Sequence, residues 1–540
     1  MFSNLKKWTK TGLEWLFNCK RNVGLQIVPY SDSSLASALA NKYTTSEIIS
    51  SKNHFIYLKG YLSSSDINAQ TIVIEEDYVS KDFLHDYASY YVLCFEPYPK
   101  VCKRVHFFDN TFTEEEFNRI ILGKESDNQD FWKHYLGFIV VKPIPITVIG
   151  YTVLKTYSCS ENINDRNFWG VRDYRIHFYG SEIVIKSLAF QEQDSVLAAC
   201  ATTAIWSMLN KASIDFYTIL KSPSQITKDA DIVSPDGSRL FPNKGLDILQ
   251  ICKAILNSGL VSEVKQPDHL IVDADTGKNI DKVVSNNYLR KILSAHSPIG
   301  IPIILVIRVP NGERYGLHAI TISGFKQKTP IAIPPQSEIS WLSENIDKFY
   351  AHDDQWGPFT RIGFVNSIEL ETPWTMFDGS KRPTYVSNII VPVYPKIRIS
   401  YEEIEVIVLG LDTILSLFFA HNTVADLVWD IKINFSEKIK SQIKDSNLED
   451  KEKLIHLTKS LAKYLWVATC YVGENKVFEF TFDATDVNNG MLGKDFICYL
   501  TPDFKPILAE FLSANRDLLE PLLNHRAKSL YYSFLIEQLS

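Results

Sequence analysis

The sequence lacks the patterns that assign many chains to a familiar class of protein. Its 540 residues include eight cysteines, but these are scattered and form no CxxC pair and no dense framework. Scattered thiols favour a reducing compartment, for which we expect the cytoplasm, and close-spaced zinc ligands are missing. The motifs GxxxxGKS/T, HExxH and GxSxG, and GxGxxG after a strand, are also absent. We therefore expect neither a cofactor nor a metal.

Long apolar runs and blocks of one charge are absent as well. The most apolar stretches are residues 138–154, which contain Lys142 and two prolines, and residues 404–419, which contain Glu405 and Asp412. Neither predicts a transmembrane span. The net charge is -7 and lysines and arginines form no cluster, so we expect no large nucleic-acid interface. A hydrophobic content of 45% with 22% charged residues is typical of a folded protein.

Residues 1–22 lack the continuous apolar segment of a signal peptide, because several lysines and Glu14 interrupt it. The pattern predicts an amphipathic helix that docks on the body of the protein. A helix that binds a membrane surface or a partner is the alternative. The apolar members of this helix are Leu5, Trp8, Leu13, Trp15 and Leu16.

The length predicts two to four domains, and changes in character along the chain suggest three. Residues 1–175 are expected to form an α+β domain of unreadable role, and residues 176–396 a second domain. Residues 397–540 are expected to form a mostly helical α+β region. In the first domain, the aromatic and β-branched residues of 54–62 and 90–98 predict strands.

Periodicity and turn signals place further elements along the chain. Strands are expected over residues 135–145, 146–157, 174–180, 182–190, 302–309, 318–325 and 348–354. Helices are expected over residues 111–122 and 246–260 and over most of 402–424 and 503–539. Residues 221–245 and 326–345 are polar or rich in proline and are expected to be surface excursions that carry specificity.

One cysteine stands in a context that suggests chemistry. Cys200 lies in "FQEQDSVLAACATTAIW", before a run that is compatible with a buried helix. If the helix begins near Cys200, its dipole favours the reactive thiolate. If Asp194 or Ser195 caps the helix, Cys200 lies more than a turn inside, where a structural role is favoured. Cys200 alone therefore favours a buried thiol.

Two later segments supply the groups that would activate a thiol. "HAITISGF" places His318 at the start of a predicted strand, where an imidazole can pair with a thiol from another element. "KFYAHDDQWGPF" ends a short strand at Asp353 and Asp354, and a carboxylate there can fix the tautomer of the histidine. The two aspartates could instead begin a turn or bind a cation.

Attack by a thiolate on an acyl carbon produces an oxyanion, which needs fixed N–H donors. The backbone amide of Cys200 and an upstream glutamine side chain would provide them. Gln193 and Gln191 are the candidates, with six and eight residues between them and Cys200. Gln193 is preferred, and Gln191 stays open.

The ordered set of glutamine, helix-opening cysteine, "HAITISGF" and aspartate before "QWGPF" resembles the papain-like cysteine peptidases. The resemblance spans about residues 185–395, in particular to uncharacterised bacterial members and to the bacteriocin-processing branch, which uses aspartate. It implies an α+β fold with a papain-like core between N- and C-terminal α+β flanking domains. In that core a helix carrying Cys200 packs on an antiparallel sheet carrying His318 and the aspartate.

The resemblance also implies roles for these residues. Asp354 would orient His318, and Trp356 would shield the bond between them. Asp353 remains the alternative, because adjacent strand residues face opposite sides. The implied activity is that of a cysteine peptidase acting on a protein or peptide.

Three alternatives stay open. The machinery of an isopeptidase, a deamidase or a transglutaminase would look the same. An inactive scaffold that binds or regulates other proteins is the alternative from another class. A regulatory protein partner that acts through the flanking domains is a further one.

Overall fold

The structure is a computed structural model. It describes residues 25–124, 128–159, 165–194, 199–215, 218–230, 245–272, 279–312, 314–328, 339–377, 382–420, 427–486, 492–501, 503–523 and 530–539. The helix predicted over residues 1–22 lies outside these residues.

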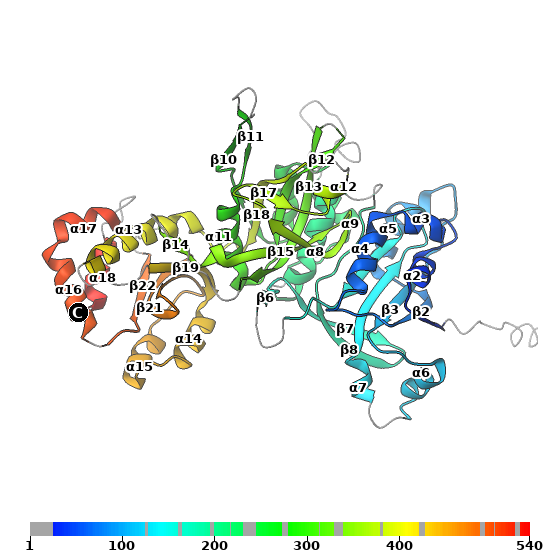
Figure 1. Cartoon of the computed structure of the whole chain (residues 1–540), viewed down its shortest axis with the longest axis horizontal. Helices are drawn as coiled ribbons and strands as arrows, with labels where there is room; N and C mark the ends of the chain where they lie inside the picture. Colours follow the sequence, from blue (N-terminus) through cyan, green and yellow to red (C-terminus); the bar gives the residue numbers. More distant parts are fainter. Residues whose placement is uncertain are drawn as a thin grey trace, which may run out of the picture.

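The chain forms a mixed α+β structure with several antiparallel sheets, as the sequence predicts at this level. Figure 1 shows the elements following one another along the long axis, from the blue N-terminal group through the green middle group to the orange and red C-terminal group. The middle sheet therefore has a flanking group on each side. Most strands pair within their own group, although the boundaries predicted at residues 175 and 396 stay a prediction.

The N-terminal group is built on an antiparallel sheet with strands in chain order. Its strands are β1 (Leu25–Pro29), β2 (Thr71–Tyr78), β3 (Cys102–Phe108), β4 (Tyr135–Val141) and β5 (Ile149–Leu154). Its helices are α2 (Asp32–Leu39), α3 (Ser46–Ser50), α4 (Asn53–Leu62), α5 (Lys81–Ser89), α6 (Glu114–Ile121) and α7 (Asn128–Trp132). The strands predicted over 135–157 and the helix predicted over 111–122 are confirmed, the latter with a capping box at Thr113.

Two strand predictions in this group are wrong. Residues 54–62 form helix α4, because their buried side chains recur at helical rather than alternating spacing. Those side chains are His54, Phe55, Leu58, Tyr61 and Leu62. Residues 90–98 form a 3-10 turn, η1 (Tyr91–Leu93), and a loop. Aromatic content favoured strands in both, although such a preference depends strongly on tertiary context.

The middle group contains an antiparallel sheet that closes on itself. Its described strands run in the order β12-β13-β15-β16-β17-β18-β9, and β12 also pairs with β18. They are β9 (Val261–Lys265), β12 (Ile303–Asn311), β13 (Arg314–Gln327), β15 (Ile346–Asp353), β16 (Gly357–Phe364), β17 (Glu369–Glu371) and β18 (Thr384–Val393), with β6 (Arg166–Asn167) on the edge of β13. The strands predicted over 302–309, 318–325 and 348–354 are therefore confirmed as β12, β13 and β15.

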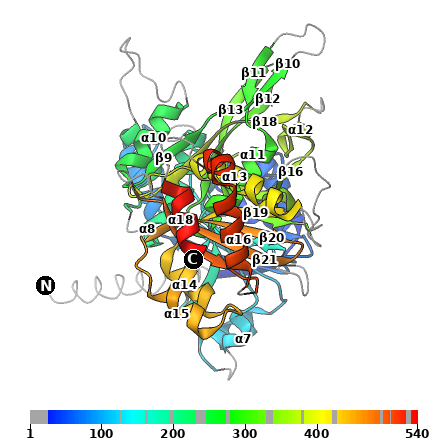
Figure 2. The same cartoon turned by 90° about the vertical axis from the view of Figure 1, so that its left-hand side faces the viewer.

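Helices surround this sheet, and this part of the chain also forms two hairpins, the first of which packs against β4 and β5 of the N-terminal sheet. The helices are α8 (Cys200–Asp215), α9 (Pro223–Ala230), α10 (Ile248–Asn257), α11 (Asn286–His296), η2 (Ser297–Ile299), η3 (Leu342–Asn345) and α12 (Trp374–Phe377). One hairpin, β7 (Arg172–Phe178) with β8 (Ser181–Ser187), matches its predicted strands. The other, β10 (His269–Val272) with β11 (Asn279–Val283), projects from the body in both views (Figure 2). The prediction of a surface excursion over 221–245 is wrong in its first part, because helix α9 packs on α8 and α10 and buries Ile226 and Ala230; residues 231–244 lie outside the described residues.

The C-terminal group combines helices with a second sheet, whose order is β14-β19-β20-β21-β22. The strands are β14 (Ser340–Trp341), β19 (Leu427–Phe435), β20 (Tyr464–Val472), β21 (Asn475–Asp483) and β22 (Gly493–Cys498). The helices are α13 (Tyr401–Ala420), α14 (Ser436–Lys444), α15 (Asp450–Thr458), α16 (Phe504–Ala514), α17 (Arg516–Leu523) and α18 (Leu530–Leu539). Strand β14 comes from the predicted 326–345 insertion and joins this sheet by pairing with β19 in parallel. A membrane-crossing helix, both long and apolar enough, is not found in the described part of the chain.

Candidate active site

Helix α8 begins at Cys200. Ala199 is not helical and caps the first turn, because its carbonyl accepts a hydrogen bond of 3.1 Å from the Thr203 amide. The Ala199 amide in turn donates to Thr202 Oγ1 at 3.3 Å. The first amides of a helix have no partner within it, and the dipole there favours negative charge. The half-buried thiol therefore occupies the position that the sequence analysis required of a nucleophile, while residues 195–198 lie outside the described residues.

Strand β13 brings His318 to this helix. Its backbone pairs with β12 and β15, and Thr321 Oγ1 donates to the Ala204 carbonyl of α8 at 2.8 Å, which fixes the helix against the strand. His318 is buried, and burial alone would lower its pKa. Asp353, the side chain of Cys200 and Asp354 outweigh burial and hold the pKa of His318 well above its usual range.

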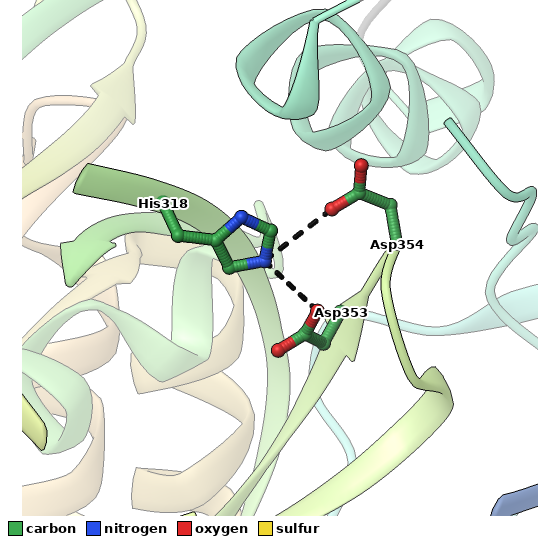
Figure 3. Close-up of side chains that lie close together, drawn as sticks. All are labelled: His318, Asp353 and Asp354. Atoms are coloured by element: carbon green, nitrogen blue, oxygen red, sulfur yellow. Dashed lines mark hydrogen bonds and ion pairs between the residues drawn. The ribbon is translucent and has the colours of Figure 1, made fainter. Parts of the chain in front are cut away.

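Asp353 is the carboxylate that hydrogen-bonds His318. His318 Nε2 donates to Asp353 Oδ1 at 2.8 Å (Figure 3). The same oxygen accepts from the Gln355 amide at 3.0 Å, and Oδ2 accepts from Trp374 Nε1 at 2.8 Å. Burial opposes ionisation, but His318 and these donors lower the pKa of Asp353. An ionised Asp353 keeps a proton on Nε2, which leaves Nδ1 of His318 for exchange with the thiol.

The structure corrects the expectation that Asp354 is the carboxylate that orients His318. Asp354 Oδ1 lies 3.4 Å from His318 Nε2, a longer contact than the 2.8 Å hydrogen bond of Asp353. Burial, with repulsion from Asp353, raises the pKa of Asp354 to about 7 although His318 opposes it. Strand β15 ends at Asp353, so Asp354 lies in the following turn, where the alternation of a strand no longer applies. Both carboxylates therefore approach the same ring nitrogen (Figure 3), and Asp353 makes the shorter contact.

Trp374 was missed by the sequence analysis. Its ring centroid lies 5.2 Å from that of His318, and its indole N–H holds Asp353. Trp356, which was expected to shield the histidine, packs edge-on against Trp374 with centroids 5.9 Å apart. Trp374 is therefore a ring beside the imidazole, and a shielding role for Trp356 stays a prediction. No spacing rule ties the short helix α12 to the aspartates, so the sequence offers no signal for it.

Gln193 lies at the edge of this constellation. Gln355 Nε2 donates to Gln193 Oε1 at 3.3 Å, which joins the segment before Cys200 to the turn after Asp353. Gln191 is buried. The oxyanion role of either glutamine stays a prediction. Gln355 is a second missed residue, since it contacts both Asp353 and Gln193.

The histidine and the two aspartates could also hold a cation. One ligand atom from each of His318, Asp353 and Asp354 lies within 4.8 Å of the others, and among the described residues this is the one such cluster. The chemistry suits a hard divalent ion only if Nε2 gives up its proton, which its hydrogen bond to Asp353 opposes. The expectation of no metal stays a prediction.

An apolar pocket adjoins the thiol and the imidazole. Its volume is about 400 Å³, and Cys200 and His318 lie in its wall. The remaining lining residues are Ala201, Leu246, Asp247, Ile248, Leu249, Ile251, Val306, Leu317 and Ala319. The single carboxylate, Asp247, accepts a hydrogen bond of 2.8 Å from the Gln250 amide at the start of α10. The pocket therefore suits a large apolar group beside the Cys200 sulfur.

Comparison with known proteins finds no matching family model and no curated protein that matches the chain.

Proposed function

We propose that the protein is a cysteine-nucleophile hydrolase with a papain-like core, most simply a peptidase. One observation carries the proposal. His318 is held by Asp353 through Nε2 and interacts with Cys200, which opens helix α8. The constellation combines a nucleophile at a helix start, a base and an orienting carboxylate.

The proposed reaction follows from these positions. His318 Nδ1 takes the proton of Cys200 Sγ, and the sulfur bonds to the carbon of a substrate amide. The amide of Cys200 and Gln193 stabilise the oxyanion. The C–N bond breaks, and His318 gives its proton to the departing amine. Water then gives a proton to His318 as it attacks the thioester, the C–S bond breaks, and Sγ regains the proton.

The raised pKa of His318 supports this cycle. An imidazole whose protonated form is stabilised takes up the proton of the thiol more readily in the first step. Ionised Asp353 stabilises the same form. Isopeptidase, deamidase and transglutaminase chemistry would use identical steps up to the thioester.

Hydrolysis of a peptide library tests the proposal. The native protein should cleave members of the library, and Cys200→Ala should abolish cleavage while leaving the fold intact by circular dichroism. Cys252→Ala is the matched control, because Cys252 is also half-buried but lies on α10, outside the described contacts of His318. Cleavage that survives Cys200→Ala would overturn the proposal, and no cleavage by the native protein would favour the inactive binding scaffold.

The apolar pocket predicts a preference for substrates that carry an apolar group beside the scissile bond. Leu249 lines the pocket and is 73% exposed, so Leu249→Glu should leave the fold intact but place a charge where an apolar substrate group binds. We expect kcat/KM for apolar substrates to fall by about 10- to 100-fold. Leu256→Glu is the matched control on the same helix, since Leu256 is 58% exposed and does not line the pocket. Equal effects of the two variants in steady-state kinetics would contradict this assignment.

A further inference from the structure

Helix α4 of the N-terminal group covers the turn that follows Asp353. His54 Nε2 lies 2.7 Å from the backbone carbonyl of Asp354, and Tyr57 Oη donates to the carbonyl of Pro358 at 2.5 Å. The contact is close, because a Cβ on Gly357 would lie 2.2 Å from the Tyr57 ring. One carbonyl of this turn and one at the start of β16 are therefore held by side chains that lie about 300 residues earlier in the chain.

The segment that leads to Cys200 is also mounted on the N-terminal group. Phe190 exchanges two backbone hydrogen bonds with Thr152, one of 2.8 Å and one of 2.9 Å. The Glu192 amide donates to the Ile149 carbonyl at 3.1 Å, and Glu192 Oε2 accepts from the Ile149 amide at 3.1 Å. The residues immediately before Gln193 thus run along the end of β5.

His54 lies between these two anchored segments. Its Nδ1 is 3.7 Å from Glu192 Oε1, which is also paired with Lys52, while its Nε2 faces the Asp354 carbonyl. His54 and Glu192 are both buried. A carbonyl oxygen only accepts hydrogen bonds, so Nε2 must carry a hydrogen. Burial lowers the pKa of His54, so the neutral ring with its proton on Nε2 is the favoured form.

We propose that His54 is a positioning residue of the active site, and that the N-terminal group completes this site rather than serving as a separate accessory. By holding the Asp354 carbonyl, His54 fixes the turn directly after Asp353 and so keeps Asp353 in place against His318. This inference rests on the proposed function.

Three substitutions of His54 distinguish a role in positioning the active site from a role in folding alone. His54→Gln keeps an N–H donor at nearly the distance of Nε2. His54→Asn is polar but too short to reach the carbonyl, and His54→Leu fills the space without a donor. His106→Gln is the matched control, because His106 is a buried histidine of the same group, with Tyr135 and Glu75 as its hydrogen-bond partners.

The readout is the rate at which iodoacetamide alkylates Cys200 in the full-length protein across about pH 5 to 9, measured by mass spectrometry. We expect His54→Asn and His54→Leu to lower the rate at acidic pH about tenfold, because a displaced Asp353 weakens the charged form of His318. His54→Gln should stay within about threefold of the native protein, and His106→Gln should leave the rate unchanged. If the substitutions only disturbed folding, the alkylation rate would not depend on whether the side chain is long enough to reach the Asp354 carbonyl.

Two results would overturn the inference. In one, His54→Asn and His54→Gln lower the rate equally; in the other, neither changes it. If His54→Leu does not fold, the Asn and Gln pair still decides the question. Failure of the proposed function looks different, because the native protein itself would then show no preferential alkylation of Cys200 at acidic pH.

Discussion

Replacing His318 with alanine should lower the rate of Cys200 alkylation at about pH 5.5 by about a hundredfold. An ordinary thiol, with a pKa near 8.5, is thiolate to only about one part in a thousand at this pH. The raised pKa of His318 keeps the imidazole protonated there and far above, so it can hold the sulfur as a thiolate. Removing the imidazole removes the partner charge, and the rate should fall towards that of an ordinary thiol.

The pH dependence of the alkylation rate should also differ between His318→Ala and the native protein. The native protein should show a plateau from mildly acidic pH upward, whereas His318→Ala should rise tenfold per pH unit until the thiol ionises without assistance. His296→Ala is the control, because His296 is a buried histidine of the middle group whose Nδ1 faces the Ile292 carbonyl. A variant without His318 that keeps the native profile would contradict the pairing.

The same substitution should have a large effect at Asp353 and a small one at Asp354. Asp353→Asn removes the charge that holds Nε2 of His318 and should lower the alkylation rate at about pH 5.5 by about a hundredfold. Asp354→Asn should change the rate less than about threefold, since the side chain of Asp354 makes only the longer contact of 3.4 Å. Equal losses in both variants, measured by the same alkylation assay, would argue that the aspartates act as a unit.

Asp354→Asn should also alter stability in a pH-dependent way. The pKa of Asp354 is raised to about 7 in the folded protein, from an ordinary value of 3.8. Between these values the unfolded chain loses the proton and the folded chain keeps it, so stability falls as pH rises towards 7. Asparagine does not titrate. The free energy of unfolding of the variant, relative to that of the native protein, should therefore rise by up to about 4 kcal/mol between about pH 4 and pH 8.

Urea unfolding at the two pH values measures this gain. The difference in unfolding free energy between variant and native protein should be larger at about pH 8 than at about pH 4. The same difference at both values would show that Asp354 ionises at its ordinary pKa in the folded protein.

The sequence predicts the proximity of Cys200 and His318 because the signals for their elements are local. Cys200 precedes an apolar run of helical spacing, and His318 begins a run of β-branched residues, so the helix start and the strand follow from short stretches. Choosing between Asp353 and Asp354 needed the end of β15, which alternation alone does not define. Trp374 reaches the site from a short helix that no periodicity links to the aspartates.

The error at residues 54–62 hid part of the candidate site. In a strand, His54 and Tyr57 would face opposite sides, whereas three residues apart on helix α4 they share one face. That face meets the turn after Asp353, so the contact could not be foreseen while the segment was assigned as a strand. The strand prediction relied on aromatic and β-branched content alone and did not consider the helical spacing of the same residues.

Competitive alkylation of the native protein at about pH 5.5 tests the central claim most directly. Cys159 is exposed and gives the rate of an accessible thiol, while burial raises the pKa values of Cys102 and Cys498 and should protect them. If His318 and Asp353 activate Cys200, iodoacetamide should label Cys200 about a hundredfold faster than Cys159 despite its lower exposure. Labelling of Cys200 no faster than Cys159, or only after unfolding, would contradict a catalytic thiol.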